Sequence, residues 1–108
     1  MQTLSLTMSQ HLSSLAPGFE GHWVYGYWGT SKTTSIYCRS AWGITALPEN
    51  GDKIICPAWQ VEDVLRNIYK IFPNRIDYNF CSEIARSLHC YGDTAYQKIE
   101  EYLWKILK

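Results

Sequence analysis

Four cysteines and three histidines are the side chains of this 108-residue chain that suggest a metal site. Zinc sites of small domains usually contain closely spaced cysteine pairs, but the four cysteines here form no such pair. If His89 and Cys90 lie on a strand, they point to opposite faces and cannot chelate one ion together. We therefore predict no metal and no cofactor, and we interpret the cysteines as reduced thiols packed as small hydrophobic residues. They are Cys38, Cys56, Cys81 and Cys90.

A thiol beside an imidazole can act as a nucleophile, and Cys81 or Cys90 with His89 is the pair that this chain offers. A β-hairpin over this region would bring Cys81 close to His89. However, no acid or amide in a recognisable motif orients the imidazole, and no oxyanion-hole loop is visible. We therefore predict no catalytic residue and keep a small Cys-dependent or hydrolytic enzyme only as an alternative.

Carboxylate pairs and glycines offer no better site. Glu62 and Asp63 are adjacent in sequence, so on a helix they diverge by about 100 degrees and cannot converge on a substrate. Gly26 and Gly29 lack the spacing and the following lysine of a phosphate-binding loop. We interpret the acidic pair as part of a solvated helix face and the glycines as a bulge and a turn.

Aromatic residues are the unusual feature, since five Trp, eight Tyr and three Phe make up 15% of the chain. Large, rigid aromatics on a surface with few charges serve as anchors in protein interfaces. They can also stack on unpaired bases, with Lys32 and Arg39 as phosphate contacts. We predict a partner-binding surface on a hairpin formed around residues 29–32, made of Trp23, Tyr25, Tyr27, Trp28, Tyr37, Arg39 and Trp42.

A β-hairpin is the element that must present these aromatics. Residues 21–29 and 33–43 are rich in Trp, Tyr, Val, Ile and Thr, which favours two strands. Alternation sends Trp28 to one face and three aromatics to the other, so helices on one side of the sheet cannot cover both sets. The three are Trp23, Tyr25 and Tyr27. Residues 53–56 predict a third strand that ends at Pro57.

Three helices are expected around this sheet. Thr7 or Ser9 is expected to cap a short first helix that ends before residues 17–18. Apolar residues at helical spacing predict an amphipathic helix over residues 60–72. A terminal helix is expected over residues 94–107, with Asp93 as its N-cap.

Two more strands are expected between the last two helices. Ile76, Tyr78 and Phe80 alternate with polar residues, and residues 85–91 follow as an antiparallel partner after a turn. The element order is then α-β-β-β-α-β-β-α. This order predicts one α+β domain over residues 1–108, with a mostly antiparallel sheet of about five strands and three helices on one face.

Charge distinguishes the two halves of the chain. Ten basic side chains balance ten acidic ones, which removes the electrostatic footprint of a protein that binds duplex nucleic acid or an anionic membrane. Residues 1–50 contain only four of these twenty charges. The first nineteen residues are uncharged, but polar side chains interrupt every apolar run and no basic segment precedes them. We therefore expect a cytoplasmic protein with no membrane partner.

Three segments resemble a loose group of small proteins encoded by bacteriophages and prophages of gut bacteria. They are the first helix ending at residues 12–15, the Pro-Ala-Trp junction within residues 56–65, and the helix start at residues 91–96. The resemblance implies phage accessory biology and transfers no site residue. At the junction, Pro57 ends strand pairing because it has no N–H, and Trp59 is expected to cover the first turn of the helix that follows.

These observations together favour a protein that acts by binding. We expect a small non-enzymatic phage-type accessory protein that binds another protein or itself, and that inhibits a host or defence factor. A single-stranded nucleic-acid or nucleotide binder that uses the hairpin aromatics is the main alternative, and the low charge of this half makes it the weaker one.

Overall fold

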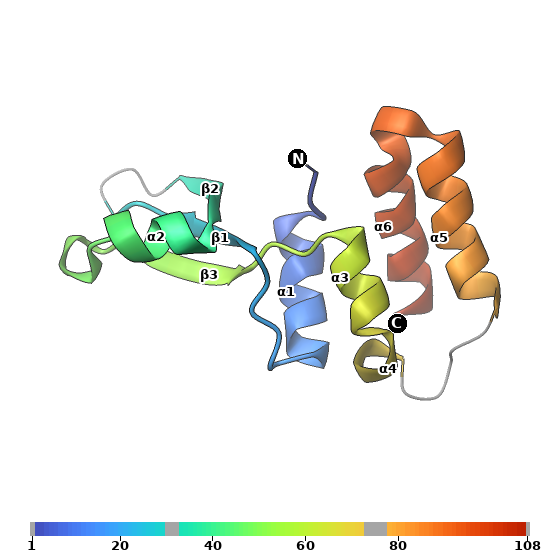
Figure 1. Cartoon of the computed structure of the whole chain (residues 1–108), viewed down its shortest axis with the longest axis horizontal. Coiled ribbons are helices and arrows are strands. Elements are labelled where there is room, and N and C mark those ends of the chain that lie inside the picture. The colour runs from blue at the N-terminus through green and yellow to red at the C-terminus, as the bar shows by residue number, and fades with distance from the viewer. Residues whose placement is uncertain (1, 30–32, 73–77, 108) are drawn as a thin grey trace.

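The computed structural model describes residues 2–29, 33–72 and 78–107 and shows an elongated α+β molecule of 47 × 29 × 22 Å. Two bodies lie side by side along the long axis (Figure 1). The sheet lobe comprises three strands, the helix α2 and a short 3₁₀ turn. The helical body comprises α1, α3, α4, α5 and α6. The α+β class is confirmed, but the number of strands and helices differs from the prediction.

The helical body contains the main core. Its helices are α1 (Leu6–Leu15), α3 (Val61–Arg66), α4 (Ile68–Ile71), α5 (Tyr78–Cys90) and α6 (Ala95–Ile106). One side of each helix is apolar, and each fully buried Leu, Ile, Val, Phe or Met side chain contributes about 1.5–3 kcal/mol to folding. The buried side chains include Leu12, Val64, Ile84, Ile99 and Leu103.

Helix α1 begins two to four residues earlier than expected. Ser5 is its N-cap, and the Ser5 hydroxyl accepts a hydrogen bond from the Met8 N–H at 3.2 Å. The prediction of Thr7 or Ser9 as the cap is wrong. Ser9 is buried instead, and its hydroxyl accepts a hydrogen bond from the Trp59 N–H at 3.1 Å. The polar side chain that suggested a helix start therefore joins two segments that are 50 residues apart.

Trp59 connects the sheet to the helical body. It follows the strand β3 (Lys53–Pro57), and its side chain is buried against the Phe19 ring, with 4.0 Å between the ring centroids. The Trp59 indole N–H donates to the Ser13 hydroxyl at 2.9 Å, and the Trp59 carbonyl accepts from the Leu4 N–H at 2.8 Å. Trp59 is therefore a core residue.

The helix predicted over residues 60–72 is present, but it is divided. Asn67 separates α3 from α4, because its side-chain amide donates to the Asp63 carbonyl oxygen at 2.8 Å and its backbone N–H is shared between the carbonyls of Asp63 and Val64. Such local bonds compete with the regular helical ladder. At the other end of α3, the Asp63 carboxylate accepts from the Gln60 N–H at 2.9 Å.

The strand pair predicted around residues 76–91 is wrong. Residues 78–90 form the helix α5, and Ile76 lies outside the described residues. The short alternation was misleading, because Phe80, Ile84 and Ser87 are spaced by four and three positions and share one buried face. That face packs on α6. The described residues offer no strand partner beside this segment, so a helix satisfies its backbone groups locally.

The terminal helix is confirmed as α6, but Asp93 does not cap it. Asp93 lies inside a 3₁₀ turn, η2 (Gly92–Thr94), which joins α5 to α6. Gly92 has a φ of +52°, a conformation that glycine adopts without strain. One turn further on, the Tyr96 hydroxyl accepts from the Val61 N–H at 3.3 Å and so satisfies a free donor at the start of α3. The half-buried Tyr96 therefore packs at the entry of two helices.

The sheet lobe contains a three-stranded antiparallel sheet in the order β2-β1-β3. Its strands are β1 (Trp23–Tyr27), β2 (Thr34–Cys38) and β3 (Lys53–Pro57), so the predicted hairpin and third strand are confirmed. The register with β3 shifts between Tyr25 and Gly26, where a bulge was expected. Of the turn predicted at residues 29–32, residues 30–32 lie outside the described residues. The described residues thus form three strands rather than five.

The second strand is shorter than predicted. It ends at Cys38, and residues 39–45 form the helix α2 (Arg39–Thr45), followed by the 3₁₀ turn η1 (Pro48–Asn50). The chain folds back at this point because the helix places the Trp42 ring against the sheet, where it is buried. A continued strand would have left Trp42 without these contacts.

Candidate functional site

The sheet lobe contains all the residues predicted to bind a partner. Among them, Trp28, Tyr37 and Trp42 form one aromatic cluster on the face of the sheet that α2 covers. Trp42 stacks on Trp28 at 5.1 Å between centroids, and Tyr37 lies 4.9 Å from Trp42 and 5.5 Å from Trp28. Such contacts stabilise a small core beyond the area that they bury. These three rings therefore hold α2 on the sheet.

Gly26 allows this cluster to form. A Cβ atom at this position would lie 3.0 Å from the Trp42 ring and 3.0 Å from the Lys53 carbonyl oxygen. The Trp42 ring can approach the sheet this closely only because the side chain is missing. The glycine that was predicted as a bulge thus also makes room for an aromatic ring.

Tyr25 is buried, which corrects the expectation that it is exposed. Only 9% of its surface is accessible, and its hydroxyl donates to the Leu4 carbonyl oxygen at 2.5 Å and lies 3.2 Å from the Thr3 hydroxyl. Burial raises the pKa of Tyr25 above its usual value. Trp23 packs beside it and is half-buried. The three aromatics on this face therefore do not form one open patch, although Tyr27 is only half-buried.

Arg39 is bound to the backbone of its own lobe. Its guanidinium donates to the Gly21 carbonyl oxygen at 3.1 Å and also to the Glu20 carbonyl oxygen, and its backbone N–H donates to the His22 carbonyl oxygen at 3.0 Å. These bonds fix the segment before β1 against the junction of β2 and α2. The proposed second phosphate contact, Lys32, lies outside the described residues.

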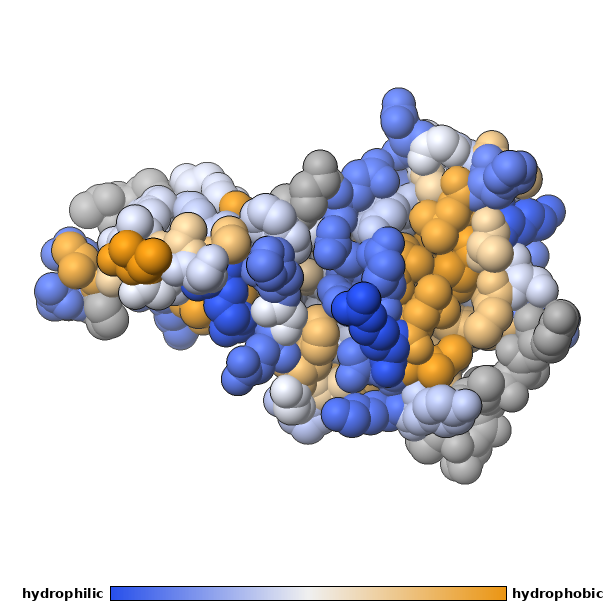
Figure 2. Space-filling view, viewed as in Figure 1, coloured by the Kyte–Doolittle hydropathy of each residue, from blue (hydrophilic) through white to orange (hydrophobic). Residues whose placement is uncertain are grey.

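Among the described residues of the lobe, the sequence analysis missed two large aliphatic side chains that are exposed. Ile44 on α2 is 83% exposed and Leu47, just after α2, is 47% exposed. Figure 2 shows apolar side chains standing out over α2, away from the helical body. At helical spacing Ile44 lies about 200 degrees from Trp42, so the turn of α2 that buries Trp42 exposes Ile44. Helical periodicity in residues 39–45 was the signal that could have found it.

Asp52 holds the segment that carries Leu47. Its carboxylate accepts hydrogen bonds from the Gly29 N–H and from the Leu47 N–H, each at 2.9 Å. Hydrogen bonds to a charged group are stronger than neutral ones. The end of β1 and the loop after α2 are therefore fixed to each other, and Leu47 is presented from an ordered loop.

The cysteines do not form a catalytic group with His89. Cys81 and Cys90 are exposed and lie on the same helix as His89, so the hairpin that would have joined Cys81 to His89 does not exist. Cys56 is buried, and burial raises its pKa. Cys38 differs, because hydrogen bonds from the Ser40 hydroxyl and from backbone N–H groups at the start of α2 lower its pKa. Its sulfur lies 3.2 Å from the Ser40 hydroxyl oxygen.

No group of three or more His, Cys, Asp or Glu side chains among the described residues is placed to hold a metal ion. Within residues 2–29, 33–72 and 78–107, no helix has the length and apolar character needed to cross a membrane.

Comparisons with protein-family models, with curated proteins and with solved structures found no match to this chain.

Proposed function

We propose that this protein acts by binding another protein, and that the sheet lobe forms the contact surface. The observation that carries the proposal is the exposure of Ile44. A large aliphatic side chain that is 83% exposed contributes almost nothing to folding, yet it lies on a helix held by three aromatic rings. Exposed apolar groups on an ordered, charge-poor surface are typical of protein interfaces.

The charges of the lobe also favour a protein over a nucleic acid. Arg39 and Asp52 are bound to backbone groups, which leaves Glu49 and Lys53 as the other charged residues described in the lobe. Nucleic-acid binding depends on several cations that neutralise phosphates. The lobe has too few of them in its described part to support that alternative.

A second apolar area lies on the helical body, where Figure 2 shows apolar side chains near α3 and α5. Leu65 on α3 and Leu88 on α5 are partly exposed. Both leucines also have a structural reason to be apolar, since they flank the buried faces of their helices. We therefore propose the sheet lobe as the contact surface. A substitution on the helical body serves as the matched control.

The resemblance to phage-encoded proteins supports a more specific proposal about the partner. A phage accessory protein acts in the cytoplasm of its host, so the expected partner is a host protein or a defence factor that binding would inhibit. Self-association through the same surface is the other form of this proposal.

Binding by purified components tests the proposal. The tagged full chain would be used to isolate a partner from a host lysate, and the affinity of the purified partner would then be measured for the wild type, Ile44→Asp and Leu88→Asp. Loss of a central interface side chain costs about 2 kcal/mol, a loss of about thirtyfold in affinity. We expect this loss for Ile44→Asp and little change for Leu88→Asp.

The opposite pattern, with binding lost in Leu88→Asp and retained in Ile44→Asp, would show that the helical body is the contact surface. Recovery of nucleic acid with a steep salt dependence would reject protein binding. Thermal unfolding of both variants is the control for folding.

A further inference from the structure

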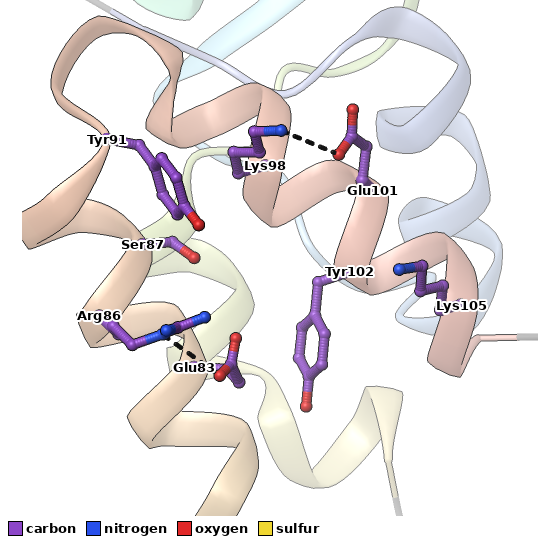
Figure 3. A pocket seen from close by; sticks show the side chains of 8 residues that line it. All are labelled: Glu83, Arg86, Ser87, Tyr91, Lys98, Glu101, Tyr102 and Lys105. Carbon is purple, nitrogen blue, oxygen red and sulfur yellow. Dashed lines mark ion pairs between the residues drawn. The ribbon is translucent and has the colours of Figure 1, made fainter.

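A polar cavity lies between α5 and α6 in the helical body (Figure 3). Its volume is about 160 Å³. A water molecule occupies about 30 Å³ in the liquid, so this space is equivalent to roughly five waters. That size suits one small polar group. The cavity belongs to a different body from the sheet lobe, so a ligand bound there is independent of the proposed function.

Positive charge predominates in the cavity wall. Arg86 comes from α5, and Lys98 and Lys105 come from α6, whereas two carboxylates, Glu83 and Glu101, oppose them. The Arg86 Nε lies 3.4 Å from the Glu83 Oε1, and the Lys98 Nζ lies 3.8 Å from the Glu101 Oε2. Both pairs are exposed, so each contributes little to stability and can rearrange.

Lys105 forms no ion pair with any described residue. Three cations and two carboxylates give the wall a net charge of +1. The site can therefore attract an anion without losing an interaction that the fold requires.

Ser87 also lines the cavity, independently of the charged residues. The residue is only 5% exposed, and its hydroxyl makes no hydrogen bond to a described residue but keeps access to the cavity. The hydroxyl can therefore donate to an acceptor that enters the cavity. Figure 3 shows the Ser87 and Arg86 side chains of α5 turned into the gap toward α6, with Tyr91 beside them. The Lys98 Nζ lies 5.7 Å from the centre of the Tyr91 ring.

We propose that this cavity binds the phosphate group of a small phosphomonoester. The cavity is rich in hydrogen-bond donors, and a phosphate group presents only acceptor oxygens together with negative charge. An arginine fork matches two of those oxygens, and lysines neutralise the charge. The carboxylates of Glu83 and Glu101 disfavour a second anionic group, so the rest of the ligand is neutral or carries a cation. Phosphoethanolamine has this character.

The test is a titration of the full chain with inorganic phosphate and with phosphoethanolamine at constant ionic strength, followed by the backbone amide signals in NMR spectra. We expect saturable shifts of the amides of α5 and α6 around Ser87. Arg86→Gln and Lys105→Gln should each weaken binding by about tenfold or more, because each removes a charge-assisted hydrogen bond. Lys53→Gln, which removes an exposed lysine of the sheet lobe, is the matched control and should change nothing.

Ser87→Ala gives a readout that is independent of the charged residues. It should weaken phosphate binding severalfold and leave the melting temperature of the ligand-free protein unchanged, because the Ser87 hydroxyl makes no hydrogen bond to a described residue. The proposal is overturned if the shifts do not saturate, if Lys53→Gln weakens binding as much as Arg86→Gln does, or if Ser87→Ala lowers the ligand-free melting temperature.

Discussion

Replacement of Tyr25 distinguishes a structural role from a role in partner binding. Alternation along β1 grouped Tyr25 with exposed aromatics, which would make Tyr25→Ala harmless to folding. The structure reverses this expectation, because Tyr25 is buried and its hydroxyl is bonded to the N-terminal segment at Leu4. We therefore expect the unfolding free energy to fall.

The magnitude follows from the contacts of the side chain. Truncation of a buried aromatic residue costs about 3–5 kcal/mol, which is a large fraction of the roughly 5–15 kcal/mol that stabilises a domain. Tyr25→Phe keeps the ring and removes only the hydroxyl, which leaves the Leu4 carbonyl oxygen without its donor. A loss of about 1–3 kcal/mol is expected for that change.

Urea denaturation followed by circular dichroism measures both values. Tyr69→Phe is a suitable control, since Tyr69 on α4 is 74% exposed and surface changes of this kind usually stay within about 0.5 kcal/mol. If Tyr25→Ala unfolded at the same urea concentration as the wild type and lost its partner, the structural argument would be refuted and Tyr25 would belong to the binding surface.

Three further predictions follow from the same contacts. Trp59→Ala should lose about 3–5 kcal/mol of unfolding free energy in urea denaturation, and loss of partner binding with unchanged stability would contradict this. Cys38 should react with iodoacetamide faster than Cys56 near neutral pH, because hydrogen bonds lower the pKa of Cys38 and burial raises the pKa of Cys56. Mass spectrometry of the labelled peptides measures the ratio of the two reaction rates, and equal rates would contradict the prediction. Burial raises the pKa of Tyr25 and of Tyr96, so the unfolded chain loses these protons first as the pH rises. Stability should then fall above the ordinary tyrosine pKa of about 10, and the fall should be smaller in Tyr25→Phe.

Local sequence patterns determined several elements of the fold. Apolar residues at helical spacing marked residues 60–72 and 94–107, and β-branched and aromatic residues marked the hairpin and the third strand. These signals are local, because the apolar residues of one segment recur at the period of the helix or strand that the segment forms. The α+β class followed from them.

Tertiary structure decided the remaining elements. Residues 78–90 contain a short alternation and also a helical spacing of Phe80 and Ile84, and only packing on α6 selects the helix. The strand β2 ends early because the Trp42 ring stacks on Trp28, which follows β1. In both cases the deciding contact joins two different elements of the chain.

The same reason explains why the candidate site moved from Tyr25 to Ile44. Alternation specifies which side chains share a face of a strand, but it does not specify which face another segment covers. The segment at Leu4 covers Tyr25 from more than twenty positions away, and the turn of α2 that buries Trp42 leaves Ile44 in solvent. The residue types alone show that this lobe is aromatic and poor in charge. Which of its side chains are exposed was decided by long-range packing, whose free energy depends on contacts that no local pattern records.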